Sequence, residues 1–195
     1  MDIDEAEKPQ RVRGSPKRVS EIAEAIAEFS GDAVTRDVIV KALKAHPRAS
    51  EVRPEKIIAN LTQLDDSLGL GRKRLVLMCC SAPSLFCARP SSVVARIDCF
   101  AAFFELDRAA FLHAARHFPQ CLYLSVAETR KRIAEVASVM GLPEPAYRQT
   151  CLGHMGLIAF GADSIRNKIE RLSGVFGCEQ AVVSGIVAKV PGLLA

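Results

Sequence analysis

The sequence contains no tryptophan, only two tyrosines and 6% aromatic residues in all. So few large aromatic side chains argue against an all-β sandwich. The composition of 49% apolar and 25% charged residues is instead typical of an α-helical protein. The chain also lacks any run of about 18 uncharged apolar residues, so no transmembrane helix and no membrane partner are predicted.

The seven cysteines contain no C-x-x-C pair, and their number is odd. Both features argue against a disulfide framework and against a zinc site, so the cysteines are predicted to be reduced thiols in the protein core. No Gly-rich phosphate loop and no H-E-x-x-H motif occurs, and His113, His117 and His154 have no recurrent acidic or cysteine partner. We therefore expect no enzymatic activity, no catalytic residue, no bound metal and no cofactor.

The net charge of +4 is unevenly distributed along the chain. Residues 1–69 carry 11 basic and 13 acidic side chains, a balance of −2, whereas residues 70–195 carry 15 and 9, a balance of +6. This asymmetry indicates a polyanionic partner for the second part. The start, MDIDEAEK, is acidic and has no apolar segment, unlike a secretory or transit peptide. The sequence thus predicts the cytoplasm of a bacterium, or an organelle matrix if a leader has been removed.

One sequence motif recurs along the chain: an apolar helical segment, a residue that ends the helix, and a short apolar turn. It is clearest at 111–124, and copies occur at 77–86 and 186–194. The residues predicted to end the helix in each copy are Pro47, Pro83, Pro119, Gly156 and Pro191. Successive differences between their numbers are 36, 36, 37 and 35. A nearly constant period in this range is the sequence signature of a repeat protein.

The apolar residues between these stops recur with helical spacing. Each unit therefore reads as a helix ended by proline, a short turn, a longer amphipathic helix and a Gly-Leu corner. Because one unit cannot bury its apolar stripe alone, neighbouring units must stack. We predict an all-α superhelical solenoid, right- or left-handed, built of repeats of about 36 residues. Residues 1–18 are predicted to be a disordered tail and residues 19–195 a single domain.

The recurring motif resembles the repeat of the mitochondrial transcription termination factor (mTERF) family. That repeat has a proline followed by paired leucines, then Arg-Ile or Arg-Val in the next helix, then Leu-Gly-Leu. The corresponding segments here are 82–86, 94–97, 132–133, 140–142, 168–169 and 190–194. The resemblance covers residues 35–195, about four and a half units. It implies a left-handed superhelix of two α-helices and a 3₁₀ turn per unit, with a basic concave groove that binds duplex nucleic acid.

Cations that recur at one repeat position are the natural partners of regularly spaced phosphates. The position before the isoleucine of the Arg-Ile pair holds a cation in three repeats, Arg96, Arg132 and Lys168. The helical turn before the proline or glycine that ends the shorter helix holds Arg116, His117, His154 and Lys189. Arg130 and Lys131 form a denser local cluster. These nine residues are the predicted nucleic-acid-binding set, and the alternative is that they are solvated faces of amphipathic helices.

From the resemblance and the charge asymmetry, we expect a monomeric, non-catalytic protein that binds double-stranded DNA or structured RNA. The expected role is in transcription, its termination or regulation, or in ribosome-related RNA metabolism. The alternative function is an α-solenoid scaffold that grips a protein partner, because the same geometry serves both.

Overall fold

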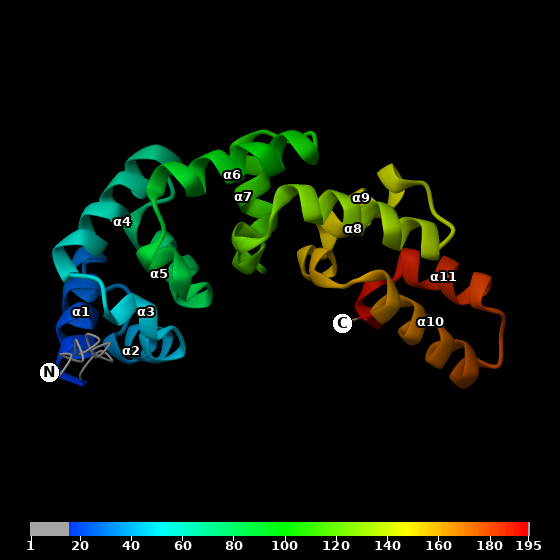
Figure 1. Cartoon of the computed structure of the whole chain (residues 1–195), viewed down its shortest axis with the longest axis horizontal. Helices are drawn as coiled ribbons and strands as arrows, with labels where there is room; N and C mark the ends of the chain where they lie inside the picture. The colour runs from blue at the N-terminus through cyan, green and yellow to red at the C-terminus, as the bar shows by residue number, and fades with distance from the viewer. Residues whose placement is uncertain (1–15, 195) are drawn as a thin grey trace, which may run out of the picture. The chain divides into compact units, whose positions relative to one another are not determined.

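The computed structural model describes residues 16–194, and in this part the chain forms α-helices and 3₁₀-helices and no β-strand (Figure 1). The predicted all-α class is confirmed. The α-helices are α1 Pro16–Phe29, α2 Arg36–Ala45, α3 Pro47–Ser50, α4 Pro54–Leu68, α5 Arg72–Ser81, α6 Pro90–Phe103, α7 Arg108–Ala115, α8 Val126–Val139, α9 Glu144–Gly153, α10 Ala162–Phe176 and α11 Gln180–Lys189. The 3₁₀-helices are η1 Pro83–Cys87, η2 Pro119–Tyr123, η3 Met155–Ala159 and η4 Pro191–Leu194.

The predicted tail falls mostly outside the described residues. Residues 16–18 were assigned to it, but they form the first turn of α1. Pro16 does not prevent this. Proline lacks a backbone N–H group, but in the first turn of a helix that group would have no hydrogen-bond acceptor within the helix.

The 3₁₀-helices begin at Pro83, Pro119, Met155 and Pro191, and the differences 119 − 83, 155 − 119 and 191 − 155 are each 36. The residue before each start has nearly the same backbone conformation. Its φ, ψ values are −139°, 70° at Ala82, −144°, 63° at Phe118, −141°, 70° at His154 and −130°, 71° at Val190. A following proline favours such non-helical angles by steric exclusion.

The third of these turns corrects one detail of the predicted pattern. Met155, not Gly156, occupies the position of the prolines, and His154 keeps the pre-proline conformation although no proline follows it. Gly156 has no positive φ, and a Cβ built on it would meet only Phe118, at 4.0 Å. The glycine at position 156 therefore gives no structural reason for this turn to be looser than the others.

A second feature recurs at the end of the longer helices. Gly69, Gly141 and Gly177 have φ values of 62°, 66° and 63°, in the left-handed region that terminates helices. Glu105 holds the same place after α6, with a φ of 58°. Glycine enters this conformation without the steric penalty of a Cβ, whereas glutamate does so at a cost.

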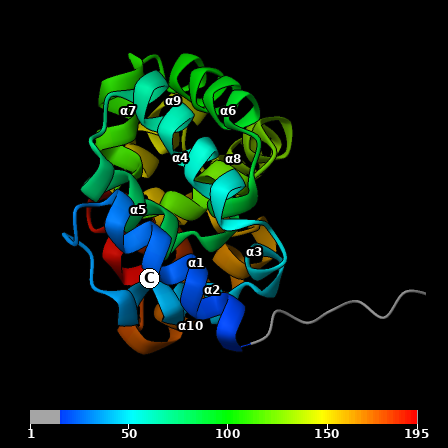
Figure 2. The same cartoon turned by 90° about the vertical axis from the view of Figure 1, so that its left-hand side faces the viewer.

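The described residues divide into two compact units, one ending at Pro90 and the other starting at Ser91. In the first unit, α1 packs on α2 and α4, α2 packs on α5, and α3 packs on η1 (Figures 1 and 2). Ile26, Leu43 and Leu61 are fully buried in its core. The longer helix of one repeat thus lies against that of the next, and the shorter helix does the same.

In the second unit, α8 packs on α9 and α10, α10 packs on α11, and η2 packs on η3. Its core includes a cluster of phenylalanine rings, in which Phe100 lies 5.7 Å from Phe111 and 6.5 Å from Phe104 between ring centroids. Burial of such apolar surface, at about 25 cal/mol per Å², is the main stabilising contribution. In the described part, no helix has both the length and the apolar character needed to cross a membrane.

Candidate nucleic-acid interface

The three cations at the recurring repeat position have the same kind of partner. Arg132 donates from Nη1 to the carbonyl oxygen of Ile158 at 3.1 Å. Arg96 donates to the carbonyl oxygen of Leu122, and Lys168 to that of Leu194. The residue numbers differ by 26 in every pair, and the three acceptors lie in η2, η3 and η4. We call these bonds the turn clamps.

The turn clamps satisfy carbonyl groups at 3₁₀ turns, where regular helical hydrogen bonding ends. A charged donor strengthens such a bond relative to a neutral one. Each clamp side chain is half-buried, and the ammonium group of Lys168 also lies 4.1 Å from the centroid of the Phe160 ring. In the first unit, Asn60 makes a related bond to the carbonyl oxygen of Ala88, at 3.3 Å. The recurrence at this position thus has a structural reason within each repeat.

The proposed phosphate contacts of Arg96, Arg132 and Lys168 stay a prediction, but their charges are already engaged. Replacing them by acidic residues would place carboxylates against carbonyl oxygens. Charge reversal at these positions would therefore perturb the fold as well as any nucleic-acid contact.

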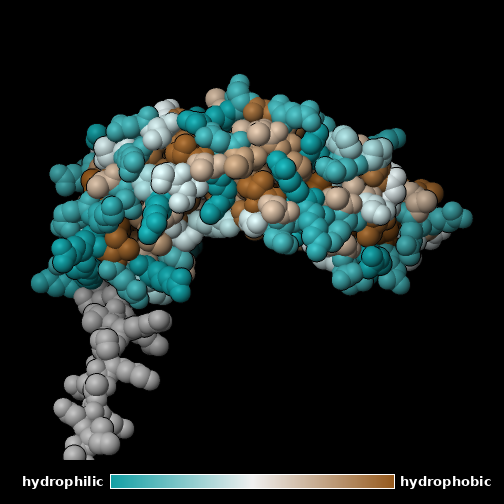
Figure 3. Space-filling view, turned by 45° about the horizontal axis from the view of Figure 1, so that its top comes forward, coloured by the Kyte–Doolittle hydropathy of each residue, from teal (hydrophilic) through white to brown (hydrophobic). Residues whose placement is uncertain are grey.

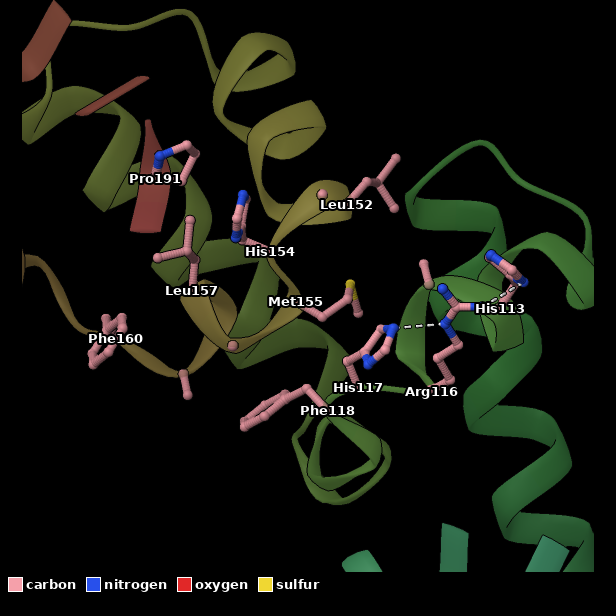
Figure 4. Close-up of a pocket in the computed structure, with 14 residues that line it drawn as sticks. His113, Arg116, His117, Phe118, Leu152, His154, Met155, Leu157, Phe160 and Pro191 are labelled. Carbon is pink, nitrogen blue, oxygen red and sulfur yellow. Dashed lines mark hydrogen bonds between the residues drawn. The ribbon is translucent and has the colours of Figure 1, made fainter. Parts of the chain in front are cut away.

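A different group of predicted residues comes together around a cleft in the second unit, with a volume of about 880 Å³ (Figure 4). Its charged and titratable lining residues come from the ends of two helices. Arg116 and His117 follow α7, and His154 follows α9. His113, in the last turn of α7, lies beside Arg116.

Arg116 is positioned by its histidine neighbours, as the dashed lines of Figure 4 indicate. Its Nε donates to Nε2 of His117 at 2.7 Å, and its Nη1 lies 3.5 Å from Nδ1 of His113. The tautomer of His117 that matches this geometry has Nε2 as the acceptor and the ring proton on Nδ1. The guanidinium fork is thereby oriented while its other N–H groups stay available for an anion.

The rest of the cleft is mainly apolar. Its apolar lining includes Met155 and Leu157 of η3, together with Phe118, Phe160 and Pro191. Met155 and Leu157 are buried, whereas Phe118 and Phe160 are half-buried. The cleft combines anion-binding groups at one side with flat hydrophobic side chains, a combination suited to a ligand that has both phosphate and ring components.

The remaining predicted residues lie elsewhere. Lys189 is exposed at the end of α11 and does not line the cleft. The guanidinium carbon of Arg130 lies 5.0 Å from the Phe103 ring centroid, which indicates a cation–π contact. Lys131 forms a 3.9 Å ion pair with Glu135, one turn later on the same helix face. On the face drawn in Figure 3, hydrophilic residues predominate, with small hydrophobic patches between them.

His113 is the cleft residue that sequence reasoning left out of the nucleic-acid-binding set. Its position three residues before Arg116 and four before His117 places all three on one helix face, and this spacing was the available signal. The cleft itself had no sequence signal, because its two sides lie one repeat apart.

The buried thiols have no environment that would activate them. Burial raises the pKa of the Cys121 and Cys151 thiols to about 12, and that of Cys80 to about 11. All seven cysteines are free. Among the described residues, no group of three or more His, Cys, Asp or Glu side chains is placed to hold a metal ion.

The recurring turns and the all-helical packing of the described residues define a class, the helical-repeat proteins. The mTERF family model matches residues 3–184, most of the chain, and the protein belongs to the mTERF family. Membership indicates a nucleic-acid-binding helical-repeat protein in a family that is generally non-enzymatic. No curated protein matches the chain.

Proposed function

We propose that the protein binds duplex DNA or structured RNA without catalysing a reaction, and that it acts in transcription or in ribosome-related RNA metabolism. In this proposal, repeats of about 36 residues form a left-handed superhelix, and the protein acts as a monomer. Its compartment is the bacterial cytoplasm, or an organelle matrix after loss of a leader.

The observation that carries the proposal is the oriented guanidinium group of Arg116 at the cleft. Arginine binds phosphate oxygens through two N–H groups at once, and an oriented side chain loses less entropy on binding. His117 and His154 extend the polar rim, and the excess positive charge of residues 70–195 would attract a polyanion over a longer range. No base-reading pattern is evident, so the proposed contacts are to the backbone.

The test is equilibrium binding of the full chain to generic duplex DNA and duplex RNA over a range of salt concentrations. The logarithm of the association constant should fall linearly with the logarithm of salt, by about 0.9 per neutralised DNA phosphate. Arg116→Ala should weaken binding to all sequences and reduce the magnitude of the slope by about 1.

The matched control is Lys41→Ala, which removes an exposed cation of α2 outside the predicted set. It should leave both affinity and slope close to their original values. A flat salt dependence for the unmodified protein would reject nucleic-acid binding. An Arg116→Ala protein that binds as well as the original would reject the cleft as the contact.

A further inference from the structure

Three of the four histidines of the chain line the cleft beside Arg116. His113 lies in the last turn of α7, His117 follows this helix, and His154 follows α9 (Figure 4). All three side chains are exposed, whereas the fourth histidine, His46, is half-buried in the first unit. Histidine is the side chain that changes its charge between about pH 5 and 8. The charge of the cleft therefore depends on pH near neutrality.

No carboxylate of the second unit compensates for this charge at the cleft. Residues 91–194, the described part of this unit, contain nine acidic side chains, and none of them lines the cleft. Four of the nine form ion pairs with arginine or lysine, namely Asp98, Glu105, Glu135 and Asp163. Asp107 accepts a hydrogen bond from the amide of Ala110. The others are Glu128, Glu144, Glu170 and Glu179.

Arg116 contacts two of the three imidazole rings. Its Nε donates to Nε2 of His117 at 2.7 Å, and its Nη1 lies 3.5 Å from Nδ1 of His113. A protonated imidazole has two N–H donors and no acceptor, so it cannot receive a hydrogen bond from a guanidinium group. The geometry therefore matches a neutral His117, and protonation of this ring would break its bond to Arg116.

Protonation would change the cleft in two ways that both favour an anion. It would release Nε of Arg116, and it would convert Nε2 of His117 from an acceptor into a charged donor. Charged donors bind phosphate oxygens more strongly than neutral ones. A bound phosphate therefore favours the protonated rings, and by reciprocity the protonated rings favour the bound phosphate.

We propose that the cleft is a proton-linked anion site, in which His113, His117 and His154 take up protons when a nucleic-acid phosphate binds beside Arg116. This inference rests on the proposed function and adds the regulation of that function by pH. The complex holds more protons than the free protein, so the association constant falls as the pH rises. Each backbone phosphate of the duplex keeps its single negative charge over this range, so the change arises in the protein.

The experiment measures binding of the full chain to a generic, fluorescently labelled DNA duplex by anisotropy, at pH 6 and at pH 8. The ionic strength is low and the same at both pH values. The readout is the ratio of the two association constants. This ratio should be about ten-fold for the unmodified chain, because each proton taken up contributes a factor of up to about ten per pH unit. Circular dichroism at both pH values checks that the fold is retained.

Three substitutions remove the titrating rings. In His117→Gln the amide oxygen can replace Nε2 as the acceptor for Arg116, and in His113→Asn it can replace Nδ1. His154→Gln removes the third ring. Each variant should lower the ratio, and the triple variant should bring it close to one. Because the ratio is taken within one variant, a loss of affinity common to both pH values cancels.

The matched control is His46→Gln, which removes the histidine that lies outside the cleft. Its Nε2 is 3.7 Å from Sγ of Cys87, in the first unit. This variant should keep the ratio of the unmodified chain. The same fall in the ratio for His46→Gln as for His117→Gln would reject the cleft as the place of protonation.

The remaining outcomes separate this proposal from the proposed function. Binding at both pH values with a ratio near one would overturn the proton linkage and leave nucleic-acid binding intact. An undiminished ratio in the triple variant would also overturn the linkage, because the protons would then be taken up elsewhere. Absence of binding at both pH values would reject the proposed function itself.

Discussion

At the scale of single residues, Glu105 shows a conflict between backbone conformation and side-chain contact. It holds a left-handed position that glycine occupies after α4, α8 and α10. Its carboxylate accepts a 2.5 Å hydrogen bond from Arg148, which also donates to the carbonyl oxygen of Phe103. The glutamate side chain is 71% exposed, so the ion pair contributes little, and the backbone penalty should be the larger effect.

Glu105→Gly is therefore predicted to stabilise the protein relative to Glu105→Gln by about 1 kcal/mol. Both variants remove the charge, but only the first relieves the left-handed strain. Urea unfolding followed by circular dichroism measures the difference. If the two variants are equally stable, the backbone at this position is not strained.

At the scale of elements, the turn clamps join each longer helix to the 3₁₀-helix that ends the same repeat. Arg132 lies in α8 and its acceptor Ile158 in η3, and α8 also packs directly on η3. A helix and a turn separated by another helix along the chain are thereby held together. This link accounts for the recurrence of a basic residue at the same position of successive repeats, and it requires no ligand.

Arg132→Ala should lower the free energy of unfolding by about 1 to 2 kcal/mol, because it removes a charge-assisted hydrogen bond to a main-chain carbonyl. Arg132→Lys should recover part of the loss, as Lys168 makes the equivalent bond in the last repeat. The neighbouring Lys131→Ala is the control and should change stability by less than about 0.5 kcal/mol, because its ion pair is exposed. If Arg132→Ala leaves the free energy of unfolding unchanged, the turn clamps do not explain why a cation recurs at this repeat position.

At the scale of the whole molecule, stability is expected to be distributed by unit. In repeat proteins each repeat contacts mainly its neighbours, so local destabilisation spreads over a limited distance. Cys79 is fully buried in the first unit, and Cys121 and Cys151 are fully buried in the second. Burial raises the pKa of all three thiols, so each should react only after its surroundings open.

Arg132→Ala should therefore accelerate thiol labelling of Cys121 and Cys151 more than that of Cys79. Labelling with a thiol-specific reagent at pH 8, followed by peptide mass spectrometry, measures each rate. Exposed Cys99 should react first in both proteins and provides the internal reference. Equal acceleration at all three buried sites would instead indicate that the described part of the chain unfolds as a single cooperative unit.

The sequence by itself determined the helical class, the spacing of the turns and the family. These properties are local: proline restricts the residue before it, glycine permits the left-handed helix ends, and the apolar period selects helices. The sequence also identified Arg96, Arg132 and Lys168 as one series. Their hydrogen-bonding partners could not be read from it, because each acceptor lies 26 residues further along, beyond an intervening helix.

Only the tertiary structure decided which side chains are engaged and which are available. Packing brings Arg116, His117 and His154 to one cleft, although they belong to consecutive repeats. It also leaves Val175, Phe176 and Leu193 exposed, while the equivalent positions of Phe176 and Leu193 in the preceding repeats of the second unit are buried. The physical reason is that burial depends on the neighbouring repeat, and the same local pattern therefore gives a core residue in one repeat and a surface residue in another.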